Sequence, residues 1–430
     1  MRQNNYKLGD CLSMIENGAT IKQKEGAGGY PITRIETLSN DRFNRDRLGY
    51  ADIYDIDNYA DHILDDEDLI MSHINSRPFL GRTVIYLKKD NEVIIHGMNV
   101  LRIKTKRELL NPFYAYYYFK TPHFRKAIDN IRTDAINQSS INTNNIKDIT
   151  IYIPSISDQE SVVATLRDID KKIELNENMN AELEAMAKQL YDYWFVQFDF
   201  PDENGKPYKS SGGKMVWNEK LKREIPEGWK VKPLSKVLSD GKSGDWGQDE
   251  EKGTYTLRVN CIRGADLKNP LEAPVRFINK KNTNRLLDYD DIIVEISGGS
   301  PTQATGRSLF VTDDLLKRYN SRLICSNFCN VLSLSNKELS MYLYYTWKLF
   351  YDNNIMFNYE GKTSGIKNLL IDVLLETNWY FPHERLFERF GTIIKGLQKL
   401  IDSNNGEIQD LMHLRDSLLP ILMNGQVTIE

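Results

Sequence analysis

The sequence repeats itself at long range, and this duplication constrains the fold more than any other feature. Segment 64–76, LDDEDLIMSHINS, resembles segment 287–299, LDYDDIIVEISGG. Each contains an acidic turn, a run of strand-forming residues and a turn of small residues. Segments 138–154 and 362–382 also correspond, because each passes from a polar Ser/Thr turn through a strand to a proline. The duplication predicts two copies of one fold.

Each copy ends in a long segment with helical periodicity. The apolar positions of the two segments differ by a constant offset of 228 residues and follow the spacing of a coiled-coil seam. They are Val162, Leu166, Ile169, Ile173, Leu183, Met186 and Leu190 in the first copy, and Phe390, Ile394, Leu397, Ile401, Leu411, Leu414 and Leu418 in the second. We therefore expect two long helices that pair in antiparallel orientation.

Two asparagines interrupt the first seam. Asn176 corresponds to Asn404, whereas Asn180 corresponds to Ile408. A buried asparagine can fix the register of paired helices, and the alternative is a solvated kink. The run Asn404-Asn405-Gly406 favours a local break in the second helix. We predict that Asn176 and Asn404 approach one another near the helix centres.

The complete plan is a mixed α/β fold, with two globular domains separated by two long antiparallel, coiled-coil-like helices in a pseudo-twofold duplication. Strands are expected over 82–87, 92–103, 291–296 and 307–312, and helices over 111–130 and 340–354. The predicted boundaries are 1–154 for the first domain, 155–198 for its helix, 199–230 for a linker, 231–382 for the second domain and 383–424 for its helix.

Composition describes an ordinary globular protein. The 430 residues carry a net charge of −4, with 40% hydrophobic residues, and the acidic excess lies mainly in 151–200. No run is long and apolar enough for a membrane span, and the first residues have no signal-peptide core, so we expect a cytoplasmic protein. The four cysteines form no CxxC pair, which predicts buried, reduced thiols and no metal site.

Catalytic motifs are missing where an enzyme requires them. A DNA methyltransferase needs an Asn/Asp-Pro-Pro-aromatic motif, but the sequence at 111–114 is NPFY, which is typical of a helix start. Pro201-Asp202 with Glu250-Glu251-Lys252 resembles a nuclease motif only loosely. Gly361-Lys362-Thr363 lacks the first glycine of a phosphate-binding loop, because Met356 stands there. We read 361–363 as a polar turn and predict no catalytic residue.

The central stretch 190–234, from LYDYWFVQFDF to VKPL, resembles the central conserved region of the specificity subunit of type I restriction-modification enzymes. KLGDCLSMIENGAT and KPLSKVLSDGKSG resemble the starts of its two target recognition domains. LMHLRDSLLPILMNGQV resembles its C-terminal conserved helix. The resemblance covers essentially the whole chain.

This resemblance implies a non-catalytic subunit that reads a bipartite site in double-stranded DNA. Its helices would measure the spacer and bind two methyltransferase subunits, and restriction subunits would join the assembly. S-adenosylmethionine, ATP and Mg would belong to those partners, with no cofactor bound by this chain. The alternatives are a stand-alone DNA methyltransferase or nuclease, or a scaffold that does not contact DNA.

Base and phosphate contacts require exposed cations and amides on loops. The candidates are Lys22, Lys24, Arg34, Arg77 and Arg82 in the first domain, and Lys242, Arg258, Gln303 and Arg307 in the second. Lys362 and Thr363 are further candidates for phosphate contacts. Because the loops of the two copies differ, we expect two different half-sites rather than a palindrome.

Overall fold

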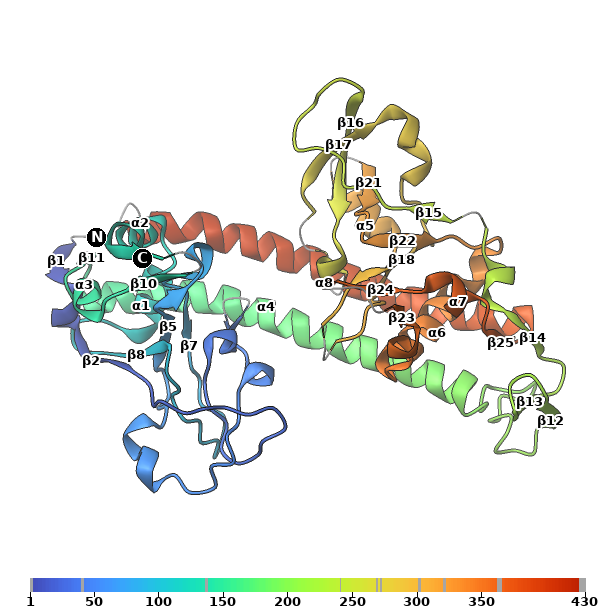
Figure 1. Ribbon diagram of the computed structural model, residues 1–430, viewed down its shortest axis with the longest axis horizontal. Coiled ribbons are helices and arrows are strands. Elements are labelled where there is room, and N and C mark those ends of the chain that lie inside the picture. Colours follow the sequence, from blue (N-terminus) through green and yellow to red (C-terminus); the bar gives the residue numbers. More distant parts are fainter. Residues whose placement is uncertain are drawn as a thin grey trace. The chain divides into compact units, whose positions relative to one another are not determined.

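The computed structural model describes residues 3–39, 42–135, 138–239, 241–267, 270, 273–300, 303–319, 322–361 and 366–424 (Figure 1). These residues form two compact units. The first comprises Met1–Lys172 and Leu411–Glu430, and the second comprises Ile173–Asp410. The predicted division into domains and separate helices therefore differs from the packing, because each unit contains one globular domain and a part of both long helices.

The first unit is built around an antiparallel sheet with the strand order β2-β8-β5-β7. A second sheet has the order β6-β10-β9, and β1 pairs with β11. The principal elements are β1 (Asn4–Lys7), β2 (Leu12–Asn17), β5 (Leu69–Ser72), β6 (Ile74–Asn75), β7 (Thr83–Ile85), β8 (Val100–Thr105), α1 (Pro112–Tyr118), α2 (Pro122–Ile131), β9 (Arg132–Asp134), β10 (Ser139–Ile141), α3 (Thr143–Lys147) and β11 (Thr150–Ile153).

The second unit repeats this topology with the orders β15-β22-β18-β20 and β19-β24-β23 and the pair β14-β25. It adds a sheet of order β17-β16-β21. Its elements are β14 (Lys230–Pro233), β15 (Lys242–Ser243), β16 (Tyr255–Ile262), β17 (Val275–Asn279), β18 (Ile292–Glu295), β19 (Ser297–Gly298), β20 (Ser308–Phe310), α5 (Asp313–Arg318), β21 (Arg322–Cys325), β22 (Cys329–Leu332), α6 (Ser340–Asp352), β23 (Glu360–Gly361), β24 (Lys367–Leu369), α7 (Ile371–Leu375) and β25 (Asn378–Phe381). The duplicated mixed α/β fold is thereby confirmed.

Three expected elements differ in detail. Of the strand predicted over 92–103, only the part from Val100 onward is β8, because a turn precedes it. The helix predicted over 111–130 is two helices, α1 and α2, since Pro122 starts a new helix that Thr121 caps. The predicted linker contains an ordered hairpin, β12 (Met215–Asn218) and β13 (Arg223–Pro226). It is followed by Trp229, which is buried in the hydrophobic core of the second unit.

Two long helices, α4 (Ile156–Tyr191) and α8 (Glu384–Met423), lie side by side within each unit (Figure 1). The residues of α4 and α8 that are hydrogen-bonded to each other follow in opposite order along the two helices, which confirms the antiparallel arrangement. Both helices are continuous, so the predicted break at Asn404–Gly406 is wrong. Helical hydrogen bonding within the pair outweighs the low helix propensity of these residues.

Most predicted seam residues are buried or half-buried. Val162, Leu166, Ile169, Ile173, Phe390, Ile394 and Ile401 are buried, and Leu183, Leu190, Leu397, Leu411 and Leu418 are half-buried. Met186 and Leu414 are exposed, and the buried residue beside Met186 is Ala187. A strict seven-residue pattern drifts around a helix of 3.6 residues per turn, which carries these two positions out of the contact.

A polar layer crosses the helix pair in the second unit. Asn176, only 1% exposed, donates from Nδ2 to Glu407 Oε2 at 2.8 Å. Asn404 donates to Asn180 Oδ1 at 2.8 Å, and Asn180 donates to Asn405 Oδ1 at 2.9 Å. As predicted, Asn176 and Asn404 lie in one layer near the middle of the helix pair, but each bonds a different residue of the opposite helix. The buried-asparagine interpretation holds, and the solvated kink does not.

The globular part of each unit contacts the helices through a different class of side chain, polar and charged in the first unit and aromatic in the second. In the first unit, Tyr117 Oη donates to Asp170 at 2.6 Å, and Arg415 donates to the same carboxylate at 3.0 Å. In the second, Tyr191, Trp194 and Phe195 are buried among the aromatic residues of α6 and α8. These three residues therefore anchor the end of α4 in the second unit, whereas Tyr193 is exposed.

Candidate nucleic-acid interface

Each unit places the same two polar segments next to each other. In the first unit, the segment that follows β5 forms β6, which pairs with β10 of the β9–β10 hairpin. In the second unit, β19 follows β18 and pairs with β24 of the β23–β24 hairpin. The shared topology therefore brings a loop and a hairpin, far apart in sequence, to one edge of each domain. The residues Lys362 and Thr363 lie outside the described residues, between β23 and β24.

The basic candidates of the first unit are mostly accessible. Lys22 is exposed, and Lys24 lies 3.8 Å from Asp52 with both side chains largely in solvent. Arg34 donates from Nε to the Arg47 carbonyl at 3.0 Å. Exposed ion pairs of this kind contribute little to stability, so these cations can exchange their partners for phosphate groups.

The last two candidates of the first unit, Arg77 and Arg82, bracket a single turn after β6. The Arg77 side chain is 65% exposed and lies 3.8 Å from Asp129. The Arg82 guanidinium stacks on the Phe79 ring at 4.5 Å and donates to the Leu38 carbonyl at 3.3 Å. The sequence did not single out Phe79, because one apolar residue in a polar loop carries no periodic signal.

The second unit contains two exposed candidates. Arg258 lies exposed on β16, and Gln303 is exposed with its amide 3.3 Å from the Tyr351 hydroxyl. Arg307 is partly buried and donates from Nε and Nη2 to the Glu295 carboxylate, at 3.0 and 2.5 Å. This hydrogen bond raises the pKa of Arg307 against the effect of burial. Both hydrogen bonds to Glu295 come from the Nε and Nη2 edge of the guanidinium and not from its Nη1 atom.

Lys242 is an internal cation rather than a surface group, which corrects its selection as a DNA contact. Its ammonium lies 2.6 Å from Asp288 and 2.8 Å from Asp291, whose side chain is fully buried. Burial lowers the pKa of Lys242, but the two carboxylates outweigh burial and the net pKa is raised. The residue looked like a loop cation in sequence because its partners lie more than 40 residues away.

In the first unit, the corresponding buried aspartate is neutralised by a cation from a different strand. Asp68 occupies the position of Asp291, and both accept a backbone N–H from the residue three positions earlier at 2.8 Å. Arg102 on β8 neutralises Asp68 at 2.6 Å. Burial nevertheless raises the pKa of Asp68. The acidic turn of the repeat is thus a buried structural motif in both copies. The cation that neutralises it comes from β8 in the first unit and from β15 in the second.

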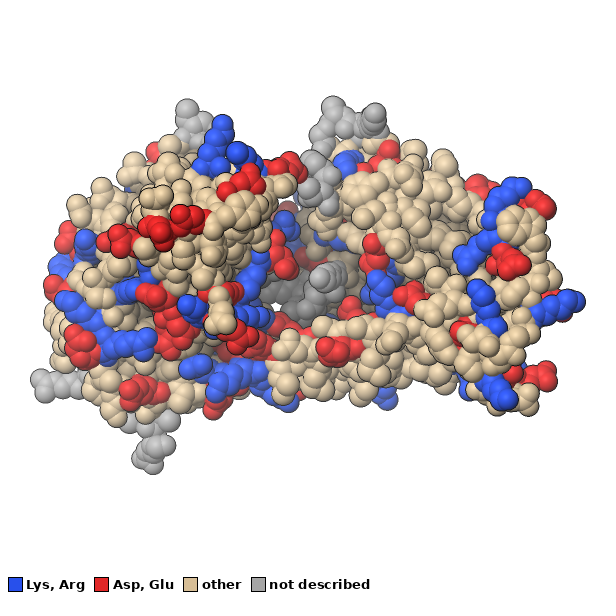
Figure 2. All heavy atoms as spheres, turned by 90° about the horizontal axis from the view of Figure 1, so that it is seen from below, with Lys and Arg blue, Asp and Glu red and all other residues tan. Residues whose placement is uncertain are grey.

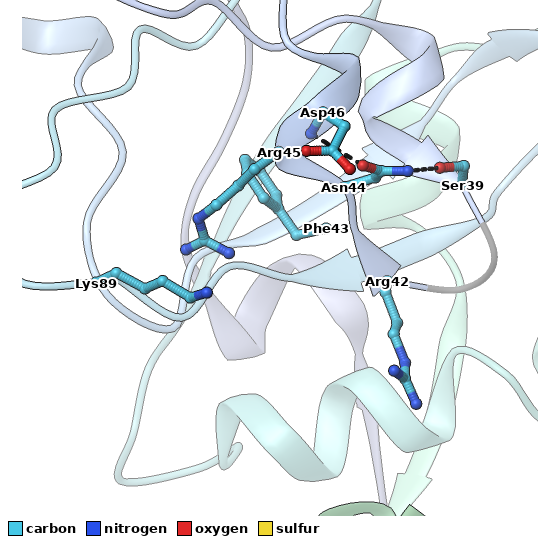
Figure 3. A pocket seen from close by; sticks show the side chains of 7 residues that line it. All are labelled: Ser39, Arg42, Phe43, Asn44, Arg45, Asp46 and Lys89. Carbon is cyan, nitrogen blue, oxygen red and sulfur yellow. Dashed lines mark hydrogen bonds between the residues drawn. The ribbon is translucent and has the colours of Figure 1, made fainter. Parts of the chain in front are cut away.

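A surface hollow of about 290 Å³ lies on the first unit, lined by Ser39, Arg42, Phe43, Asn44, Arg45, Asp46 and Lys89. Figure 3 shows Arg45 and Lys89 extending on one side of the hollow, whereas Arg42 extends away from them. Glu92 accepts from Arg45 Nε at 2.9 Å, and this bond lowers the pKa of Glu92 to about 2. This group has no local signature in the sequence, because Lys89 lies more than 40 residues away from the other lining residues.

The structure places residues of two rejected enzyme motifs, the methyltransferase-like and the nuclease-like one. Asn111 caps α1 by accepting from the amides of Phe113 and Tyr114, as expected for a helix start. Pro201 lies in an irregular bridge with Pro207, apart from any sheet strand. All four cysteines are reduced and buried, and burial raises the pKa of Cys261 to about 12. No group of three potential metal ligands occurs among the residues that the structure describes.

Charge of both signs is mixed on the face of the molecule drawn in Figure 2. Figure 2 shows Lys and Arg interspersed with Asp and Glu across the visible face. The balance agrees with the net charge of −4. On this face, a contact with a polyanion would therefore depend on local groups of cations and not on a continuous basic surface. In the described part of the chain, no helix is long and apolar enough to cross a bilayer.

Comparison with known proteins agrees with this architecture. Residues 3–185 match the family model of the type I restriction modification DNA specificity domain. The chain is 30% identical over 299 residues to a Methanocaldococcus jannaschii protein described as the MjaX type I restriction enzyme specificity subunit, covering 67% of this chain and 65% of that protein. The match thus spans slightly less than two thirds of that relative.

Two further relatives extend the comparison. The MjaIX specificity subunit of Methanocaldococcus jannaschii is 25% identical over 332 residues, covering 74% of this chain and 69% of that protein. The crystal structure of an S subunit of a type I restriction-modification system from M. genitalium has the same fold, with a TM-score of 0.51, 15% identity and coverage of 98% and 96% of the two chains. In these comparisons the chain is similar to the specificity subunits of type I restriction-modification enzymes.

Proposed function

We propose that this chain is the sequence-specific DNA-binding subunit of a type I restriction-modification complex, and that it has no catalytic role of its own. It reads an asymmetric, bipartite site in double-stranded DNA, one half with each unit. The observation that carries the proposal is the duplicated loop-and-hairpin edge, which recurs with the same topology and different side chains.

The difference between the two edges supports two different half-sites. The first carries Arg77, Phe79 and Arg82, whereas the second carries Gln303 and the Glu295–Arg307 pair. Hydrogen-bonding side chains read base edges and cations contact phosphates. Lys22, Lys24, Arg34 and Arg258 are proposed as phosphate contacts, together with Lys89 at the hollow in Figure 3. Lys242 is left out, because its ammonium is committed to buried carboxylates.

The proposal assigns the chemistry to partners. Two methyltransferase subunits use S-adenosylmethionine, and restriction subunits use ATP and Mg for translocation and cleavage. The continuous α4 and α8 are the proposed binding surface for the methyltransferase subunits and set the spacer between the half-sites. The assembly works on genomic DNA in the cytoplasm.

Mapping methylated bases in a host that expresses this chain with its cognate methyltransferase subunit tests the proposal. The expected result is one asymmetric motif with two defined halves separated by a spacer of fixed length. A symmetric palindrome would contradict the two-half-site interpretation. If the purified complex binds DNA without sequence preference, the chain is a scaffold and the proposal is wrong.

Expressing the chain alone addresses the remaining alternative. We expect no methylation and no cleavage of DNA without the partner subunits. Activity in the absence of any partner would instead identify a stand-alone methyltransferase or nuclease. The control is the same host with the methyltransferase subunit alone, which should leave the genome unmodified at the mapped motif.

A further inference from the structure

The turn Arg77–Arg82 in the first unit is built as a rigid tip with an exposed aromatic ring. It forms a short 3₁₀ segment, Arg77–Phe79, after Ser76. Its ends close on β5, because the Gly81 amide donates to the Ser72 carbonyl at 2.7 Å and the Ser72 amide donates to the Arg82 carbonyl at 2.8 Å. Leu80 is buried beneath the turn, and Phe79 is 43% exposed at its surface.

One face of α2 holds this turn in place. Arg125 donates from Nη2 to the Arg77 carbonyl at 2.6 Å and from Nη1 to the Leu80 carbonyl. Ile128 packs under Gly81, where a Cβ atom would lie 3.0 Å from its Cγ2 atom. Asp129 faces the Arg77 side chain at 3.8 Å. Positions three and four apart lie on one face of a helix, so a single helical face supplies the whole support.

Gly81 fits this arrangement for a second reason. Its φ of +74° lies in the left-handed region, which glycine adopts without strain. The chain can therefore turn sharply between the buried Leu80 and Arg82, and the backbone can approach α2 closely. The turn is held by fixed hydrogen bonds and packing rather than by exposed side chains that must be ordered on binding.

The side chains on the turn have the composition of a DNA contact. The Arg82 guanidinium stacks on the Phe79 ring at 4.5 Å, which orients the ring, and Arg77 extends into solvent. Apolar side chains such as phenylalanine contact thymine methyl groups or enter between base steps, while neighbouring arginines contact phosphates and bases. An isolated exposed phenylalanine needs no explanation, but here an arginine stacks on the ring and a helix fixes its backbone.

We infer that Phe79 makes an apolar contact with a base of the first half-site, and that Arg125 is the positioning residue that holds its turn. The inference rests on the proposed DNA-binding function and goes beyond it by naming the contact and its support. The corresponding turn of the second unit carries Gln303 instead of an aromatic residue. The apolar contact therefore belongs to one half-site only.

The test uses the full chain assembled with its methyltransferase subunit and the DNA motif mapped for the wild type. Binding is measured on two DNA libraries, each randomised in one half-site. Phe79→Ala is expected to weaken binding to the wild-type site about tenfold and to broaden one or two positions of the first half-site, as for loss of one base contact. The second half-site should stay unchanged.

Arg125→Ala and Arg125→Lys test the positioning role. Lysine cannot reproduce the planar fork that bonds two carbonyls, so both variants should broaden the same positions as Phe79→Ala. A purely structural role would lower the amount of folded protein without changing the preference at the first half-site alone. Thermal unfolding of each variant measures the folded fraction separately.

Two matched controls complete the design. Trp217→Ala removes another exposed aromatic side chain, on the hairpin β12–β13 outside both recognition edges, and should leave both half-sites unchanged. Gln303→Ala should broaden the second half-site and not the first. If Phe79→Ala retains the wild-type preference at the first half-site, the inference is overturned while the proposed function stands. If the wild-type complex has no sequence preference, both fail.

Discussion

At the scale of single residues, partners across the fold decide whether a charge belongs to the surface or the interior. Lys24 and Lys242 both look like loop cations in sequence, yet one is largely in solvent and the other lies between two carboxylates. Removing the cation that pairs with buried Asp291 would destabilise the folded state, because an unpaired buried charge is strongly unfavourable. Lys242 is therefore a structural residue.

Lys242→Ala is expected to lower the free energy of unfolding by about 3 kcal/mol, the range found when one partner of a buried ion pair is removed. Urea unfolding followed by circular dichroism measures this change. Lys24→Ala is the matched control and should stay within about 0.5 kcal/mol of the wild type. A Lys242→Ala protein of wild-type stability with weakened DNA binding would restore Lys242 as a DNA contact.

His96 gives the first unit a predictable response to acid. The side chain is buried, and burial lowers its pKa to about 3, against about 6.5 in an unfolded chain. Below pH 6.5 the unfolded chain takes up a proton that the folded chain does not. The free energy of unfolding therefore falls as the pH falls from about 6.5 towards 3, by up to about 1.4 kcal/mol per pH unit.

Unfolding at pH 7, 6 and 5 tests this linkage by comparing the wild type with His96→Gln. The variant is expected to be less stable at pH 7 but to lose less stability on acidification. His123→Gln, at an exposed position, should keep the wild-type pH slope. An unchanged slope in His96→Gln would show that other groups cause the acid response.

At the scale of elements, the helix pair combines an apolar seam with one polar layer. Periodicity predicted both helices and most seam residues, because burial of one face repeats every three or four residues. Periodicity could not identify the partner of Asn176, since the partner depends on the axial register of α8 relative to α4. The hydrogen bond to Glu407 is an outcome of this register.

Asn176→Asp is expected to destabilise the helix pair by about 3 kcal/mol, because it buries a second carboxylate against Glu407. Thermal unfolding of the full chain measures the effect. The control is Asn178→Asp, an identical change at an exposed position two residues away, which should stay within about 0.5 kcal/mol of the wild type. Equal effects of the two substitutions would argue against a buried polar layer.

At the scale of the whole molecule, α4 and α8 are shared by the two units. The division between the units crosses α4 between Lys172 and Ile173 and α8 between Asp410 and Leu411. No covalent connection other than these two helices passes from one unit to the other. Their length is therefore the feature that the proposed function requires to set the spacer.

Insertion of seven residues at both crossing points is expected to lengthen the pair by about 10 Å and to preserve the apolar face of each helix. The methylated motif should keep both half-sites, while the spacer grows by about three base pairs at ~3.4 Å per pair. Methylome mapping gives the result directly. Altered half-sites with an unchanged spacer would show that the helices do not measure the distance.

Sequence patterns were sufficient to predict the duplication, the two long helices, the mixed α/β class and the family resemblance. These features follow from patterns that repeat along the chain, such as the offset of 228 residues and the heptad spacing. The sequence also placed Arg77 and Arg82 on a polar loop, although nothing local marked Phe79 between them.

Tertiary structure alone decided which side chains work together. It paired Lys242 with Asp291, Asn176 with Glu407, and Arg125 with the turn that carries Phe79. These partners come from elements separated by tens to hundreds of residues, so no local pattern relates them. Burial then fixes their roles, because a polar group removed from water must find its partner within the fold.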